Sequence, residues 1–158
     1  MIIFINGSIN SGKSTISKLL SQKIEKPAVV EIDSLSEFIE WMPIEESVPI
    51  NLENAVAVIR NFAKRNFNVI VPYPLSQKNY DYMTENLRGI DEKIFVFTLN
   101  PKLETILKNR GERKLNDWER KRIEYHYAKG INSPSFGNYL TIMQTLSREP
   151  LIYLCKKW

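Results

Sequence analysis

The sequence is poor in the residues that build disulfides and zinc sites. It has one cysteine, Cys155, and one histidine, His126. A single cysteine cannot form an internal disulfide, which suits a reducing cytoplasm. One histidine and one cysteine are too few for a metal site of the His/Cys kind. We therefore expect a cytoplasmic protein without such a site.

Long apolar runs are missing as well. No stretch approaches about 18 consecutive apolar residues, so we expect no transmembrane helix and no membrane partner. The first residues, "MIIFING", lack the basic start and the small-residue cleavage site of a signal peptide. They predict a buried strand instead.

Charge is close to balanced, and the excess is local. The net charge is +4, and residues 108–122, "KNRGERKLNDWERKR", hold seven Lys or Arg against three Asp or Glu. This segment fits either a solvated helix surface or an arginine-bearing lid over phosphates. Nucleic-acid binding is not expected, because the basic cluster is short and acidic residues interrupt it.

The 158 residues fit one domain, in which strands alternate with helices. Alternation of this kind predicts an α/β fold, with a parallel sheet covered on both faces. Ligands bind such sheets beyond the carboxyl ends of the strands. We expect strands at 2–6, 28–33, 68–71, 93–99 and 138–143. We expect helices at 13–25, 33–41, 51–66, 76–88, 101–109 and 116–130, and a last one from near Ser147.

The stretch "GSINSGKS", residues 7–14, has the spacing of a phosphate-binding loop. It follows an apolar strand and opens an amphipathic helix, the context that such a loop needs. Its backbone N–H groups can converge on phosphate oxygens, and the helix dipole adds positive potential. Lys13 should reach the outer phosphates, and the Ser14 hydroxyl should bind Mg²⁺. The residues expected to bind ATP are Gly7, Ser8, Ile9, Asn10, Ser11, Gly12, Lys13, Ser14 and Thr15.

Asp33 ends the second expected strand, near the expected γ-phosphate. Its carboxylate could take a proton from a substrate hydroxyl during phosphate transfer. It could instead hold a Mg²⁺-bound water, or cap the helix that follows. Capping and catalysis are compatible roles.

The end of the third strand reads "NVIVPYPL" and has no acidic residue. Pro72 stands where many phosphate-loop enzymes hold Mg²⁺ through an acid and a water. Two prolines flank Tyr73 and could aim its ring into the cleft. Either Mg²⁺ relies on Ser14, phosphates and water, or catalysis has weakened.

Arg110 and Arg113, three positions apart and beside Gly111, are the candidate lid arginines. In a mobile segment they could neutralise charge that develops on the transferred phosphoryl group. For Arg120 and Arg122, on a helix, a surface role is favoured. A packing or surface role is also favoured for His126, which has no partner visible in the sequence. Trp41 and Met42 could line an acceptor pocket, with packing as the default.

The loop, together with "IDSLSEFIEWMP" some twenty residues later, resembles the chloramphenicol phosphotransferase branch of small phosphate-loop kinases. The wider group includes shikimate, gluconate and adenylylsulfate kinases. The resemblance implies a three-layer sandwich around a five-stranded parallel sheet, in one domain over 1–158 with a lid at about 108–130. It also implies ATP and Mg²⁺ as cofactors, Asp33 as the catalytic base, and Lys13, Arg110 and Arg113 as the groups that offset charge.

The sequence thus favours an ATP-dependent kinase that acts on a hydroxyl of a small molecule. A nucleotide-binding module without transfer chemistry is one alternative, and it is suggested by Pro72 in place of an acidic residue. A nucleoside or nucleotide kinase is another, in which Trp41 or Tyr73 would stack on the base.

Overall fold

The computed structural model describes residues 1–90, 93–109 and 113–140. Five strands form one sheet in the order β2-β3-β1-β4-β5, and every neighbouring pair is parallel. The parallel sheet confirms the α/β prediction and brings all carboxyl strand ends to one edge. The strands are β1 (Ile2–Asn6), β2 (Pro27–Val29), β3 (Asn68–Pro72), β4 (Ile94–Leu99) and β5 (Asn138–Leu140).

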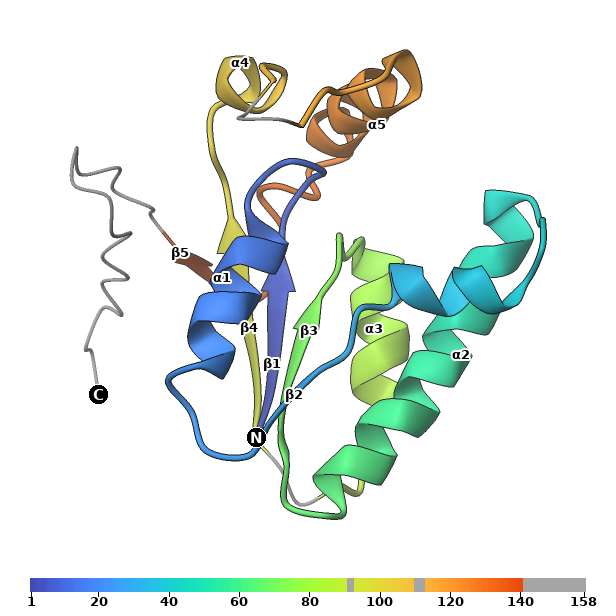
Figure 1. The fold of residues 1–158 in the computed structure, drawn as a ribbon, viewed down its shortest axis with the longest axis vertical. Helices are drawn as coiled ribbons and strands as arrows, with labels where there is room; N and C mark the ends of the chain where they lie inside the picture. Colours follow the sequence, from blue (N-terminus) through green and yellow to red (C-terminus); the bar gives the residue numbers. More distant parts are fainter. Residues whose placement is uncertain (91–92, 110–112, 141–158) are drawn as a thin grey trace.

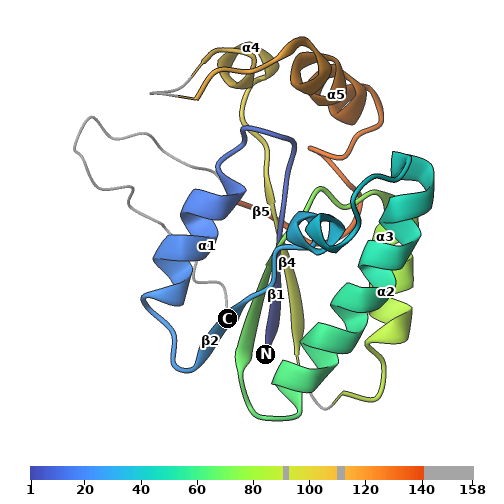
Figure 2. The same cartoon turned by 45° about the vertical axis from the view of Figure 1, so that its right-hand side comes forward.

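Helices lie on both faces of the sheet and beyond its carboxyl edge (Figures 1 and 2). α1 covers one face, whereas α2 and α3 cover the other, and α4 and α5 lie near the loop that follows β1. None of the helices in the described ranges is long and apolar enough to cross a membrane. The helices are α1 (Lys13–Ser21), the 3₁₀-helix η1 (Asp33–Phe38), α2 (Ile44–Ala63), α3 (Gln77–Asn86), α4 (Leu103–Ile106) and α5 (Asp117–Ala128).

Alternation along β1 divides the core in two. Ile2 and Phe4 pack into the cluster under α2 and α3, whereas Ile3 and Ile5 pack against α1. Successive side chains of a strand point to opposite faces, so a strand buried on both faces reads as a continuous apolar run. The continuous apolar run at residues 2–6 therefore indicates that β1 is a central strand of the sheet.

α2 differs most from the sequence prediction. It begins at Ile44 rather than near residue 51, with Pro43 at its N-cap and Pro49 inside it. A proline at that position removes one backbone hydrogen bond, and periodicity that starts at Leu52 does not reveal the extra turns. Glu45 and Glu46 in the first turn offset the cost, because acidic groups are favourable at the positive end of a helix.

Other boundaries are shorter than expected. α1 ends at Ser21, β2 ends at Val29, and α4 has only four residues. The helix expected to reach Trp41 is a 3₁₀-helix that ends at Phe38. The helix expected from near Ser147, and the last part of the strand expected at 138–143, lie outside the described residues.

Candidate functional site

The loop between β1 and α1 needs glycine at two places. Gly7 has φ 147°, and a Cβ there would lie 2.7 Å from Ser11 Oγ and 2.9 Å from the Leu99 carbonyl oxygen. Gly12 has φ 99°, and Asn10 also has a positive φ of 60°. Only glycine fits the first position without a shift of backbone, and glycine adopts the second at little cost. The backbone of this loop therefore depends on both glycines.

Asn6 anchors the base of this loop. Its side-chain amide donates to Thr98 Oγ1 and to the Ile131 carbonyl, each at 3.0 Å, and its Oδ1 accepts from the Leu75 N–H at 2.8 Å. Asn6 is fully buried, so these bonds satisfy a polar group that would otherwise be costly in the core. They tie β1, β4 and the chain after β3 together directly beneath Gly7.

A cavity of about 360 Å³ opens at the carboxyl edge of the sheet. Gly12, the N-cap of α1, has no side chain, and in the part of the chain that the structure describes no side-chain cap bonds to the start of this helix. Free N–H groups at a helix start, with the positive end of the dipole behind them, suit phosphate oxygens. Ten residues line the cavity: Ile9, Asn10, Gly12, Lys13, Ser14, Thr15, Glu31, Asp33, Pro72 and Arg113.

Lys13 lies in the middle of this cavity, and its Nζ donates to the Ser8 carbonyl at 2.8 Å. Burial lowers the pKa of Lys13 to about 8, and Arg113 adds to the decrease, whereas Asp33 and Glu31 oppose it. No carboxylate forms a direct ion pair with this amine among the described residues. The amine is thus placed where a phosphate would supply the missing negative partner.

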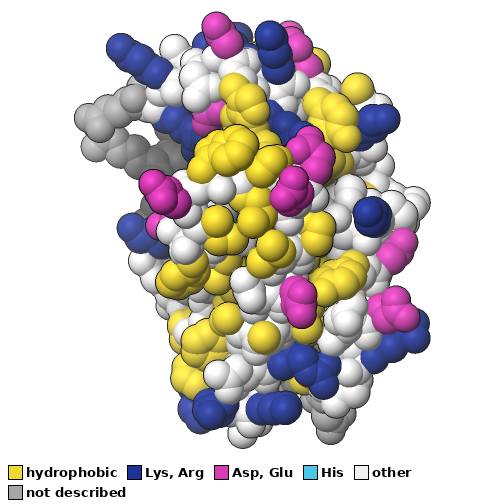
Figure 3. Space-filling view, turned by 90° about the vertical axis from the view of Figure 1, so that its right-hand side faces the viewer, with side chains coloured by type: hydrophobic (Ala, Val, Ile, Leu, Met, Phe, Trp, Pro, Cys, Tyr) yellow, Lys and Arg dark blue, Asp and Glu magenta, His cyan; other side chains and the backbone are white. Residues whose placement is uncertain are grey.

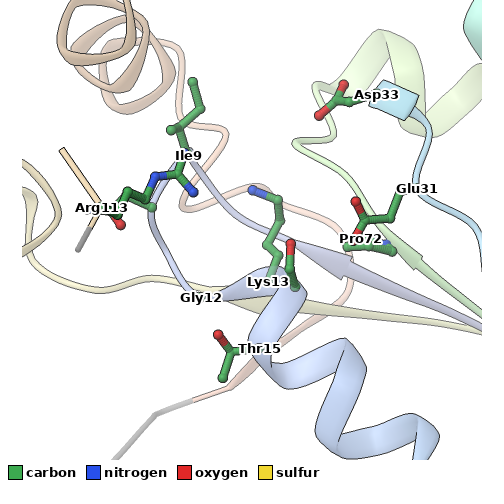
Figure 4. A pocket seen from close by; sticks show the side chains of 10 residues that line it. Ile9, Gly12, Lys13, Thr15, Glu31, Asp33, Pro72 and Arg113 are labelled. Atoms are coloured by element: carbon green, nitrogen blue, oxygen red, sulfur yellow. The ribbon is translucent and has the colours of Figure 1, made fainter. Parts of the chain in front are cut away.

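Asp33 begins η1 and lies on the cavity wall opposite Arg113, with Lys13 between them (Figure 4). Loss of solvent raises the pKa of Asp33, with a smaller contribution from Glu31. Lys13 and Arg122 act in the opposite direction. A carboxylate with a raised pKa is a better proton acceptor than an ordinary aspartate, which suits the role predicted from the sequence.

Glu31 was not among the residues predicted from the sequence. It lines the cavity beside Pro72, and the two side chains lie next to each other in Figure 4. β2 pairs with β3, and the Val30 N–H donates to the Ile70 carbonyl at 2.9 Å, so the residue after Val30 is carried to the end of β3. A carboxylate from the neighbouring chain segment therefore stands next to the position where β3 offers only proline.

Pro72 and Tyr73 are placed differently from each other. Pro72 ends β3 and lines the cavity, as the sequence predicts. The Tyr73 ring is 5% exposed and joins the core cluster under α2, so it is not available for stacking on a base. Burial raises the pKa of Tyr73 to about 12, and the nearby Asp33 carboxylate contributes to this increase.

The structure separates the basic residues of 108–122 into different environments. Arg113 lines the cavity and also forms an ion pair with Glu119 at 2.9 Å. Arg120 donates hydrogen bonds to the Leu107 carbonyl and to Asn109 Oδ1, so it connects α5 to the chain just after α4. Arg122 stacks on Tyr125 at 4.9 Å and lies close enough to lower the pKa of Asp33. Arg110 lies outside the described residues.

His126 is buried, with its Nδ1 3.1 Å from Ser8 Oγ in the loop. Its burial agrees with the favoured packing role, and the contact with Ser8 supplies a partner that the sequence did not reveal. The two residues are 118 positions apart, so no local pattern could reveal the contact. Trp41, by contrast, is 79% exposed, so the packing role that the sequence favoured for it is not seen.

The described residues include no group of three or more His, Cys, Asp or Glu side chains that could hold a metal alone. Mg²⁺ bound with a nucleotide needs fewer protein ligands, because phosphates and waters supply the rest. Ser14 is exposed at the start of α1 in the same cavity as Glu31 and Asp33. Hydroxyl and carboxylate oxygens are the donors that Mg²⁺ prefers, so these residues fit a Mg²⁺–nucleotide complex.

No protein-family model matches the sequence, and no curated protein matches it. Solved structures do resemble the fold. A sugar kinase from Janibacter sp. HTCC2649 has a TM-score of 0.64 at 15% identity, covering 88% of this chain and 83% of its own. A gluconokinase from Sinorhizobium meliloti 1021 has a TM-score of 0.61 at 16% identity, covering 90% and 83%.

A tunicamycin resistance protein from Deinococcus radiodurans has a TM-score of 0.59 at 17% identity, covering 86% of this chain and 84% of its own. The chain spans a smaller share of three other matched structures, 64%, 51% and 40% of their length; two of these are chains of the Pnkp1/Rnl/Hen1 RNA repair complex. Similarity at these identities shows a shared fold. The chain has the fold of P-loop kinases.

Proposed function

We propose that this protein is an ATP-dependent kinase that transfers the γ-phosphate to a hydroxyl of a small molecule. The observation that carries the proposal is the shared cavity. It gathers the start of α1, the Lys13 amine, the Asp33 carboxylate and the Arg113 guanidinium at the carboxyl edge of a sheet with a P-loop kinase fold. A phosphate loop, a base and a cation are the parts that phosphoryl transfer needs.

The acceptor oxygen attacks the γ-phosphorus, and the bond to the bridging oxygen of ADP breaks. Asp33 receives the proton of the acceptor hydroxyl. The N–H groups of residues 12–15 hold the phosphates, and Lys13 leaves the Ser8 carbonyl to bind them. Arg113 faces the same cavity and offsets the charge that develops on the transferred group, with Arg110 in the same segment. Catalysis of this kind is mostly positioning and electrostatics.

The Ser14 hydroxyl would hold Mg²⁺ directly, and Glu31 would hold it through water, in place of the acid that β3 lacks. The ion supplies neutralisation of charge on the phosphates. Glu31 suits this role because it lines the cavity beside Pro72 and forms no ion pair with another described residue. This proposal also explains how a chain with proline at the end of β3 could retain transfer chemistry.

The acceptor that this site suits best is an uncharged or amine-bearing alcohol. Residues 27–59 contain seven acidic residues and no Lys or Arg. Acidic side chains flank exposed hydrophobic ones on the face that carries η1 and α2 (Figure 3). Phe38 and Trp41, 86% and 79% exposed, would pack on an apolar part of the acceptor. A phosphorylated acceptor or a nucleic acid would meet repulsion at this wall.

We further propose that the sheet and its helices form the three-layer sandwich of the nucleoside and shikimate kinase type, close to the chloramphenicol phosphotransferase-like group. Residues 108–130 would be the lid in this arrangement. Two of the structures with a similar fold, a sugar kinase and a gluconokinase, support a hydroxyl compound as the acceptor.

A nucleotide-binding module is the second candidate, and Pro72 is the observation that favours it. The test is ADP release from ATP, measured with Mg²⁺ and a panel of alcohols: uncharged, amine-bearing, carboxylate-bearing and phosphate-bearing. The kinase proposal expects stimulation by members of the first two classes only. Stimulation by nucleosides alone would favour a nucleoside kinase, and MgATP binding without any stimulation would favour the binding module.

A further inference from the structure

Ser8 is the loop residue that contacts both the phosphate-binding lysine and α5. It is fully buried, and its carbonyl accepts the Lys13 amine at 2.8 Å and the Ser11 N–H at 3.3 Å. Its side-chain oxygen lies 3.1 Å from Nδ1 of His126. The backbone oxygen of Ser8 thus faces the lysine that would bind phosphate, whereas the side chain faces α5.

The two residues that follow Ser8 also contact the α4 and α5 region. Ile9 packs against the cluster formed by Ile106, Leu115 and Ile123. The Asn10 side-chain amide donates to the Ile106 carbonyl at 2.8 Å and to the Lys108 carbonyl at 3.2 Å. Three consecutive loop residues are therefore held by one unit, residues 103–109 and 113–128, through a side-chain hydrogen bond, apolar packing and bonds to backbone oxygens.

Among the described residues of this unit, His126 is the one whose side chain bonds to Ser8. It is 2% exposed and lies three positions after the buried Ile123, on the inner face of α5. The same unit carries Arg122 and, just before α5, Arg113. The contact that holds α5 against Ser8 therefore also sets the distance between these two arginines and the loop.

We propose that His126 is a positioning residue for the phosphate loop: its hydrogen bond to Ser8 sets the loop in the conformation that binds nucleotide and couples that loop to α5. When Lys13 turns from the Ser8 carbonyl to the phosphates, the Ser8 side chain keeps its partner, so the loop keeps its shape. This inference rests on the proposed nucleotide site.

The environment of the imidazole supports this role. Burial lowers the pKa of His126 to about 4, and the nearby Arg122 and Lys13 contribute to the decrease. The ring is therefore neutral at physiological pH, and a neutral imidazole can pair with a hydroxyl without adding a third positive charge beside Lys13. A lysine or arginine at position 126 would place a positive charge beside Lys13 and repel it.

The test is MgATP binding by titration calorimetry, with wild type, His126→Phe, Ser8→Ala and the double variant. Losing this bond is expected to raise the Kd about fivefold to tenfold in each single variant. The double variant should bind no more weakly than the weaker single variant, because both remove one interaction. His126→Asn can place an amide atom near the position of Nδ1 and should restore binding to within about threefold.

Tyr125→Phe is the matched control, because it changes an exposed aromatic ring on the same helix. It should bind MgATP as wild type does. Ser8→Ala removes one oxygen and keeps the inference testable if His126→Phe does not fold. The inference is overturned if wild type binds MgATP and the single variants bind equally well, or if the two effects add. Failure of wild type itself to bind MgATP would overturn the proposed function as well.

Discussion

Lys13 and Asp33 line one cavity, and each stabilises the charged form of the other. Asp33 raises the pKa of Lys13, and Lys13 lowers the pKa of Asp33. In both cases loss of solvent is the larger effect and acts in the opposite direction. The pair is thus held at a cost in stability, which is typical of groups placed for chemistry rather than for folding.

This cost leads to a prediction for Lys13. Its pKa falls to about 8 in the folded protein, from its usual value of 10.5. The unfolded chain therefore binds more protons between pH 8 and 10.5, so the Lys13 contribution to the free energy of unfolding rises with pH in that window. Lys13→Met should be more stable than wild type at pH 7, by ~1–2 kcal/mol, while losing MgATP affinity.

Urea unfolding at pH 7 and pH 10.5 measures this effect. The stability difference between Lys13→Met and wild type should shrink as the pH approaches 10.5, because the folded wild-type protein then buries a neutral amine rather than a charged one. A variant that is less stable than wild type at pH 7 would contradict the burial of a charged amine at this site.

Glu31 gives a prediction about the metal. Glu31→Gln should raise the Mg²⁺ concentration needed for tight ATP binding about tenfold. Loss of a side chain that hydrogen-bonds to a ligand of a metal typically lowers the metal affinity by about that factor. Calorimetric titration of ATP at a series of Mg²⁺ concentrations measures it. Glu25→Gln, at an exposed position after α1, is the control. An unchanged Mg²⁺ dependence in Glu31→Gln would remove Glu31 from the metal site.

Arg113 gives a prediction about the transition state. Arg113→Gln should lower the transfer rate about a hundredfold while changing MgATP affinity little, because its charge is needed most when the phosphoryl group moves. Comparison of kcat with the calorimetric Kd separates the two effects. Arg65→Gln is the matched control, since Arg65 follows the end of α2 and its guanidinium donates to the Asn61 carbonyl of that helix. An equal loss in binding and rate would assign Arg113 to ground-state binding.

The parts of the fold that the sequence predicts are those with local causes. β1, the loop and the start of α1 follow from an apolar run, two glycines and an amphipathic period that come in succession. Asp33 follows from its place after the second strand. These signals need no knowledge of the rest of the chain.

The parts that sequence reasoning missed depend on contacts between distant segments. β2 ends at Val29, and only its pairing with β3 brings Glu31 beside Pro72. His126 meets Ser8 because α5 packs on the loop, a contact across 118 positions. α2 extends over Pro49 because acidic residues and tertiary packing outweigh one missing hydrogen bond.

Phosphate transfer from γ-labelled ATP with Mg²⁺, into a pooled extract of small metabolites, tests the central claim most directly. Wild type, Asp33→Asn and the control Asp81→Asn on α3 run side by side. We predict a labelled product with wild type and with the control, and roughly 10²–10⁴-fold less with Asp33→Asn, the usual contribution of a general base. Full turnover in Asp33→Asn would contradict the base assignment, and no labelled product from wild type that binds MgATP would contradict the kinase proposal.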